Sequence, residues 1–334
     1  MRKLLEIGYM ARDFVRVASG RDYFHAPQPL GPYFTQRGAI RGCYYNDLRR
    51  KADWTGATHL GAPIIYFPAL GEEIAFPITV LQFGLGATDR WLLEGAEADR
   101  RRALDAVRWT LASLRVDGSL PNRFPELQPG LPFFSDNSGM ACGEALSLLT
   151  RAITNRIVEG TELQTAELAV RRIADSLLAP IEDGGTSLHR GEEISFCELC
   201  RRDEHVILNG WIFALFGLRD YAKHTGCAAA RRAYDQSVAT LDRRASEYLL
   251  PDGWSLYDTH GRVASPFYHQ LHIALLGAMT RLEPDASRLA DVVARMESAD
   301  SPLNRTRYTV AKAWRKLCER KPYATVGAAP KRAA

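Results

Sequence analysis

The chain has 334 residues, of which 46% are hydrophobic and 25% are charged, and its formal net charge is +4. These values are typical of a globular protein with a sizeable core, and they exclude an intrinsically disordered chain and a strongly basic nucleic-acid-binding domain. Arginine supplies 36 of the 43 basic side chains, and its planar guanidinium group suits carboxylates and sulfates, so the composition is compatible with an anionic partner.

The sequence contains no run of eighteen or more apolar residues, so it predicts no membrane span. Met1-Arg2-Lys3 is similar to the charged start of a signal peptide, but Glu6, Arg12 and Asp13 interrupt the hydrophobic region that should follow. The six cysteines have irregular spacing, which is not typical of a disulfide framework. We therefore expect a cytoplasmic protein with reduced thiols.

Residues 1–75 are rich in glycine, proline and aromatic residues. A short helix is predicted from Leu4 to Val17, and Pro63–Phe67 and Leu70–Phe76 are predicted to form a small hairpin. We expect this segment to be an N-terminal cap over one end of the domain that follows. At the other end of the chain, residues 321–334 are small and polar and are predicted to be disordered.

After residue 76 the chain is predicted to be helical, because apolar residues recur at three- and four-residue spacing. The predicted helices are residues 97–116, 138–158, 161–179, 206–224, 227–249, 267–281, 286–298 and 304–319. Turn and helix-stop signals such as Asp183-Gly184-Gly185 separate them. This organisation favours an all-α dominated fold, an (α/α) toroid or barrel over residues 76–320. In it, residues 206–218 are predicted to be an inner helix and residues 227–245 an outer, amphipathic one.

Polar residues that can do chemistry stand at the edges of apolar helices in the second half of the chain. Glu198 precedes Asn209-Gly210 by about ten residues, and Tyr257-Asp258 and Tyr268-His269 follow. In this order, these elements resemble the C-terminal catalytic domain of the D-glucuronyl C5-epimerases. The resemblance extends more loosely over residues 76–275, through Gln82-Phe83-Gly84-Leu85-Gly86 and Asp136–Ala145.

The resemblance implies an isomerase that converts glucuronate into iduronate residues within heparosan-type polysaccharides. Inverting the carbon next to a carboxylate requires acid–base groups on both faces of the sugar ring and hydrogen-bond donors that neutralise the carboxylate. The predicted catalytic residues are Glu198, Tyr268 and Tyr257, and the predicted substrate-binding residues are Asn209, Arg262, His269, His272 and Asp258. Among these, Arg262 is chosen for its place in the loop between the two tyrosines. No redox cofactor and no obligatory metal are expected.

Structural explanations stay open for each candidate residue. A tyrosine at such a position is often half-buried with its hydroxyl bonded to the backbone, an isolated histidine often belongs to the core, and Asn209-Gly210 can simply start a helix. Cys197 and Cys200, with His205 close behind, are a weak candidate for a zinc site or a regulatory disulfide, since a structural zinc ion needs four ligands.

Two other functions stay open beside the epimerase. A polysaccharide lyase would form the same carbanion but expel the 4-linked sugar. A non-catalytic glycan-binding toroid would fit the presence of Leu199 where the resembled element has a tyrosine. The expected partner in each case is an acidic polysaccharide or oligosaccharide, and the likeness to dimeric enzymes implies a homodimer. No nucleic-acid partner is expected, because the basic residues are interleaved with acidic ones.

Overall fold

The computed structural model describes residues 23, 25–32, 40–67, 72–121, 137–200 and 205–318. The predicted helix Leu4–Val17 and the predicted disordered tail 321–334 lie outside these residues. Within them, no helix combines the length and the apolar character that crossing a membrane requires.

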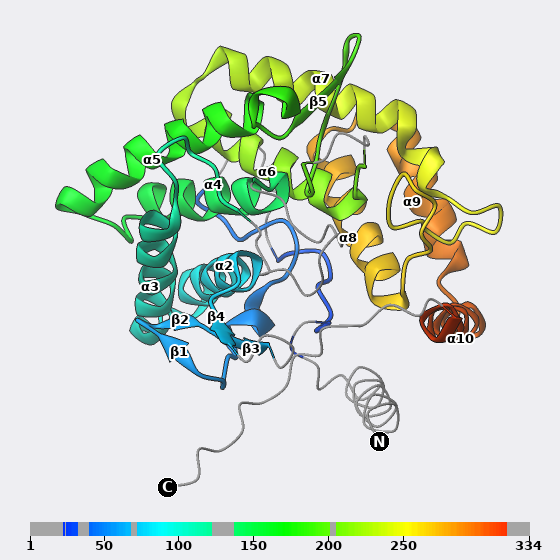
Figure 1. Ribbon diagram of the computed structural model, residues 1–334, viewed down its shortest axis with the longest axis horizontal. Coiled ribbons are helices and arrows are strands. Elements are labelled where there is room, and N and C mark those ends of the chain that lie inside the picture. Colours follow the sequence, from blue (N-terminus) through cyan, green and yellow to red (C-terminus); the bar gives the residue numbers. More distant parts are fainter. Residues whose placement is uncertain are drawn as a thin grey trace, which may run out of the picture.

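The fold is an (α/α) toroid built from consecutive helix pairs, and Figure 1 shows the helices arranged around a central stretch of chain. The inner helices are α2 (Pro77–Glu94), α4 (Gly139–Thr154), α6 (Leu208–Thr225) and α8 (Pro266–Leu282). The outer helices are α3 (Glu97–Ser113), α5 (Gly160–Leu178), α7 (Ala228–Arg244) and α9 (Ser287–Ala299), and α10 (Pro302–Cys318) follows. Neighbouring inner helices pack on one another, as do neighbouring outer helices, so the predicted toroid is confirmed. Short 3-10 helices are η1 (Arg49–Ala52), η2 (Ile181–Asp183) and η3 (Ala245–Tyr248).

The hydrophobic pattern of each helix explains its layer. In α6, every residue from Leu208 to Ala222 is buried, because this helix is apolar nearly all round. In α7, only one stripe is buried, and Arg231 and Arg232 are exposed. The predicted inner helix 206–218 and outer helix 227–245 therefore correspond to α6 and α7.

Two glycines allow α4 and α6 to approach closely. Gly143 of α4 lies against the backbone of Phe213 and Ala214, and Gly217 of α6 lies against the backbone of Gly143. A Cβ atom at either glycine would collide with backbone atoms that cannot move aside. Close helix contact thus explains the small residue at position 143.

Strands in the described part of the chain form three antiparallel pairs: β1 (Thr58–His59) with β2 (Ala62–Pro63), β3 (Ile65–Phe67) with β4 (Glu72–Ile74), and β5 (Ser187–Arg190) with β6 (Glu193–Phe196). The predicted hairpin is β3–β4, in which Ile65 pairs with Ile74. The β5–β6 hairpin, in which Ser187 pairs with Phe196, was not predicted from the sequence. It packs on α7 and leads towards α6, so it connects the outer layer to the inner one.

Residues 40–52 reach into the ring of helices (Figure 1). The rings of Tyr44 and Tyr45 are buried and stack on Phe213 and Phe216 of α6, with centroid distances of 6.5 and 4.1 Å. Aromatic side chains of this size remove a large apolar area from water, which holds this segment in the core. The described part of the predicted cap therefore shares one hydrophobic core with the toroid.

Candidate active site

The N-terminal ends of three inner helices are tied together by two loops. Cys197 O, in the loop before α6, accepts a hydrogen bond of 2.8 Å from Gly139 N at the start of α4. Tyr257 O, in the loop before α8, accepts one of 3.1 Å from Leu208 N at the start of α6. The positive ends of these long helices therefore lie close together, which favours a negatively charged ligand at this mouth of the toroid.

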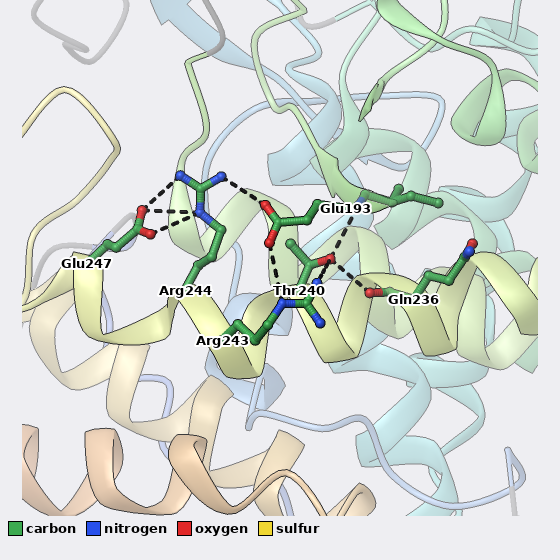
Figure 2. A network of polar contacts seen from close by, with 7 residues as sticks. Glu193, Gln236, Thr240, Arg243, Arg244 and Glu247 are labelled. Carbon is green, nitrogen blue, oxygen red and sulfur yellow. Dashed lines mark hydrogen bonds and ion pairs between the residues drawn. The ribbon is translucent and has the colours of Figure 1, made fainter. Parts of the chain in front are cut away.

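Strand β6, which leads directly to Glu198, is anchored on α7. Figure 2 shows Glu193 between two arginines: its Oε1 accepts from Arg243 Nε and its Oε2 from Arg244 Nη1, each at 3.3 Å. The backbone N–H of the next residue donates to Thr240 Oγ1 at 3.2 Å. These contacts fix the end of the hairpin from which the Glu198 loop departs.

The carboxyl group of Glu198 is buried at the start of α6, and the residue is 9% exposed. A Cβ atom on Gly210 would lie 2.7 Å from Glu198 Oε2, so the glycine makes room for the carboxyl group. Oε2 has no hydrogen-bond partner among the described residues. Burial raises the pKa of Glu198 to about 7, against the opposing effect of the Arg262 charge. At neutral pH the group therefore populates both protonation states, as a general acid or base must.

Tyr257 and Tyr268 form a pair beside this carboxyl group. Their ring centroids are 4.7 Å apart at an interplanar angle of 67°, and the Tyr257 hydroxyl donates to the Tyr268 hydroxyl. Burial raises the pKa of Tyr268 to about 12 and also raises that of Tyr257, and the charge of Glu198 adds to both shifts. Both side chains keep part of their surface in solvent. The structure thus brings the three predicted catalytic residues together.

Arg262 lies over this pair and is held by Asp258. Its guanidinium carbon is 5.1 Å from the Tyr257 ring centroid, and its Nε donates to Asp258 Oδ2. The same carboxylate oxygen lies 2.8 Å from His205 Nε2, and Oδ1 accepts from the backbone N–H groups of His260 and Arg262. Asp258 is buried with both oxygens engaged, so it positions Arg262, whose side chain remains 40% exposed.

Asn209 and Glu144 are two further buried polar residues, and each has one side-chain oxygen without a hydrogen-bond partner among the described residues. Asn209 Nδ2 lies 3.7 Å from Met140 Sδ, and neither Asn209 Oδ1 nor Glu144 Oε2 has a partner among the described residues. Glu144 Oε1 accepts a 2.9 Å hydrogen bond from Gln82 Nε2. Burial, reinforced by the charge of Glu198, holds the pKa of Glu144 well above its usual range.

Glu144 was not among the predicted site residues. The signal that could have found it is a carboxyl group within an inner helix that is otherwise apolar, with the amide of Gln82 in the neighbouring inner helix. Such groups are retained in a core only with a partner or a function.

His269 and His272 do not join this group, contrary to the prediction from the sequence. His269 is fully buried against Trp254, its Nδ1 accepts from Ser255 N at 3.1 Å, and its Nε2 lies 3.1 Å from Met296 O. His272 is also fully buried, with Nδ1 at 3.0 Å from Ser255 Oγ, and burial lowers its pKa to about 3. Both histidines are neutral, because burial lowers the pKa of each. Their hydrogen bonds to Ser255 fix the loop before α8.

The Cys197 and Cys200 pair shows no ligand set around it. Cys200 Sγ donates to Cys197 O at 3.4 Å, and Cys197 is buried. Across the described ranges, no three His, Cys, Asp or Glu side chains are arranged to hold a metal ion.

Nine chains of solved structures are similar to this chain, and two of them are as follows. A UGL variant with dGlcA-Glc-Rha-Glc is 17% identical, with a TM-score of 0.45, and an unsaturated glucuronyl hydrolase from Bacillus sp. GL1, responsible for the degradation of glycosaminoglycan, is 16% identical, with a TM-score of 0.43. Each match covers 66% of this chain and 61% of the other, so the chain spans about 61% of the length of these proteins. No curated protein matches the chain.

The sequence model of one protein family matches residues 136–298, and its description is D-glucuronyl C5-epimerase C-terminus. The matched range includes the residues of the candidate active site near the N-terminal ends of α4, α6 and α8. These are Glu144, Glu198, Asn209, Tyr257 and Tyr268. Residues 136–298 of this chain are therefore similar to the D-glucuronyl C5-epimerase C-terminus family.

Proposed function

We propose that this chain is a uronate C5-epimerase that converts glucuronate into iduronate residues within an acidic polysaccharide or oligosaccharide. The observation that carries the proposal is the buried, unpartnered carboxyl group of Glu198 beside the hydrogen-bonded hydroxyls of Tyr257 and Tyr268. A carboxyl group and a phenol that can each transfer a proton are the two groups that inversion at a carbon needs. The match of residues 136–298 to the D-glucuronyl C5-epimerase C-terminus family supports the class of substrate.

In this mechanism Glu198 is the base. Because its pKa is about 7, its carboxylate is available at neutral pH to take the proton from C5. The electron pair of the C5–H bond moves into the sugar carboxylate and gives a carbanion of enolate type. Tyr268, which is protonated at neutral pH, gives its hydroxyl proton to the opposite face of C5. Solvent then returns a proton to Tyr268 and accepts the one held by Glu198, and the reverse reaction exchanges the two roles.

The phenolate that Tyr268 becomes is stabilised by its neighbours. Tyr257 donates a hydrogen bond to the Tyr268 oxygen, and the charge of Arg262 lowers the pKa of both phenols. Asp258 holds the arginine in place. These three residues therefore counteract part of the burial that would otherwise keep Tyr268 from releasing its proton.

The sugar carboxylate gains negative charge as the carbanion forms, and the helix ends are placed to accept it. The first turn of α6 contains no acidic residue and has no side-chain cap. Leu208 N is bonded to Tyr257 O, so the backbone N–H groups of Asn209 and Gly210 and the amide of Asn209 are the donors that can face a carboxylate. Preorganised donors of this kind stabilise developing charge without having to reorient.

Leu199 stands where the resembled element has a tyrosine. The Tyr257–Tyr268 pair supplies the phenol that the mechanism uses, so the substitution does not remove the second proton-transferring group. The site therefore retains both partners of an epimerisation.

The test is incubation with heparosan and other glucuronate polymers in deuterated water. We expect deuterium at C5 of the product, detected by NMR, together with iduronate. An unsaturated product with ultraviolet absorbance would instead identify a lyase. Glycan binding without exchange or cleavage would leave a non-catalytic toroid and refute the epimerase.

A further inference from the structure

A cavity lined by basic side chains lies at the opposite end of α6 from Glu198. It has a volume of about 400 Å³ and is lined by Arg219, Ala222, Lys223, Gly226, Ala228, Arg231 and Tyr234. Arg219 follows Asn209 by ten residues, which corresponds to about 15 Å along a helix axis. The cavity is thus separate from the candidate active site, and it lies where α6 ends and α7 begins.

The lining contains three cationic side chains and no carboxylate. Arg219 is only 6% exposed, and its Nη1 donates to the neutral hydroxyl of Tyr45 at 3.2 Å. Among the described residues it forms no ion pair, and the adjacent Asp220 is already paired with Arg151 at 3.1 Å. The charge of Asp220 compensates part of the cost of burying the Arg219 guanidinium group, and an anion in the cavity would compensate it further.

Two carboxylates contact residues of the lining, and one of them neutralises a lining cation. Arg231 pairs through Nε with the exposed Asp235 at 2.8 Å, and Glu283 Oε1 accepts a 2.9 Å hydrogen bond from the Tyr234 hydroxyl. Lys223 is exposed and forms no ion pair within the described ranges. Neither carboxylate therefore neutralises Arg219 or Lys223.

The start of α7 attracts anions, and the last carbonyl groups of α6, which lie at the same place and carry partial negative charge, oppose this attraction. Its N-cap residue, Cys227, makes no side-chain cap, and its first turn contains no acidic residue. The first backbone N–H groups of a long helix carry a partial positive charge. Three cationic side chains and a helix N-terminus therefore surround one cavity.

We propose that this cavity binds an oxyanion, namely the phosphate, sulfate or carboxylate group of a small molecule, between α6 and α7. Planar arginine donors and a lysine ammonium group match the oxygen atoms of such a group. The proposal is independent of the epimerase mechanism, because none of the lining residues belongs to the candidate active site.

The experiment measures binding of sodium phosphate, sodium sulfate and sodium glucuronate to the full chain by calorimetry and by thermal unfolding, with sodium chloride at matched ionic strength as reference. The variants are Lys223→Ala and Arg231→Ala, with Arg232→Ala as the matched control, since Arg232 is an exposed neighbour outside the lining. Sulfate and phosphate also stabilise proteins non-specifically, but that effect is the same in all variants.

We expect saturable binding in the wild type and in Arg232→Ala, with Kd raised about tenfold in Lys223→Ala and in Arg231→Ala. Tighter binding of glucuronate would assign the site to carboxylates, and tighter binding of phosphate or sulfate would assign it to tetrahedral oxyanions. Absence of a saturable component for all three anions, or an unchanged Kd in both lining variants, would overturn the proposal.

Discussion

Two buried polar clusters in this toroid differ in how many of their side-chain oxygens have a hydrogen-bond partner. Inside the ring, Asp220 accepts hydrogen bonds from Arg151 at 3.1 Å and from the Tyr45 hydroxyl at 2.6 Å. At the N-terminal ends of the inner helices, Glu198 and Glu144 each leave one carboxyl oxygen without a partner in the described structure. Both clusters are removed from water, so the difference lies in the partners and not in the burial.

The comparison distinguishes a buried carboxyl group that stabilises the fold from one that is available for proton transfer. A paired buried carboxylate fixes the chain, whereas an unpaired one holds its proton more tightly and weakens the fold at high pH. Natural proteins tolerate such a loss of stability where activity requires it. The Asp220 cluster therefore belongs to the fold, and the Glu198 cluster belongs to the proposed chemistry.

The largest effect is expected for Tyr268→Phe, which removes the proposed proton donor without changing the shape of the ring. We expect the rate of C5 deuterium exchange to fall about a hundredfold to ten-thousandfold, the usual contribution of a general acid or base. The matched control is Tyr221→Phe, a change of the same kind on α6 away from the site. Equal rates in the two variants would remove Tyr268 from the mechanism.

Breaking the paired cluster should instead affect stability. We expect Arg151→Met to lower the free energy of unfolding by about 3–5 kcal/mol, because it leaves Asp220 buried and uncompensated. Urea unfolding measures this loss. The double variant Arg151→Met with Asp220→Asn should recover part of it, and a single variant as stable as the wild type would contradict the role given to this pair.

Replacing the unpaired carboxyl group of Glu198 should instead raise the free energy of unfolding at high pH. The pKa of Glu198 is raised from 4.5 to about 7, so the folded chain holds a proton that the unfolded chain releases, and stability is lost as pH rises through this window. Glu198→Gln lacks this titration. We expect it to be more stable than the wild type above pH 7 by at most about 3 kcal/mol, and equally stable below pH 4.5. Urea unfolding at both pH values checks this, and a destabilised variant at high pH would mean that Glu198 has a partner.

The smallest effect is expected for the surface contacts that anchor β6. Glu193 is partly exposed, so Glu193→Ala should lower the free energy of unfolding by less than about 1 kcal/mol. A loss of several kcal/mol, or the loss of all exchange activity, would show that the hairpin depends on these ion pairs. Such a result would mean that the burial of Leu188 and Ile194 in the same hairpin is not enough to hold it in place.

Much of the fold could be predicted because the signals are local. The apolar run from Leu208 to Leu218 has the spacing of an inner helix, and the Ile65-Tyr66-Phe67 run of β3 has a high strand propensity. The β5–β6 hairpin was missed because its burial depends on contact with α7, and no pattern within residues 187–196 reports that contact. The burial of Tyr44 and Tyr45 inside the ring likewise depends on contacts with Phe213 and Phe216, which no local pattern reports.

The residues of the candidate site also divide into those that could be predicted from the sequence and those that depend on contacts between distant parts of the chain. Glu198, Tyr257 and Tyr268 were found from their order along the chain, and the structure brings them together. His269 and His272 were misassigned, because adjacency to Tyr268 in sequence does not say which side of α8 faces the core. Glu144 was missed because its significance depends on being close to Glu198, a residue 54 positions later in the chain.

The most direct measurement of the central claim is the rate of C5 deuterium exchange as a function of pH. If the desolvated carboxyl group of Glu198 is the base, the rate should rise about tenfold per pH unit in acid and level off near pH 7, where this group releases its proton. A rate that is independent of pH between about 5 and 8, or a rising limb that persists in Glu198→Gln, would contradict it.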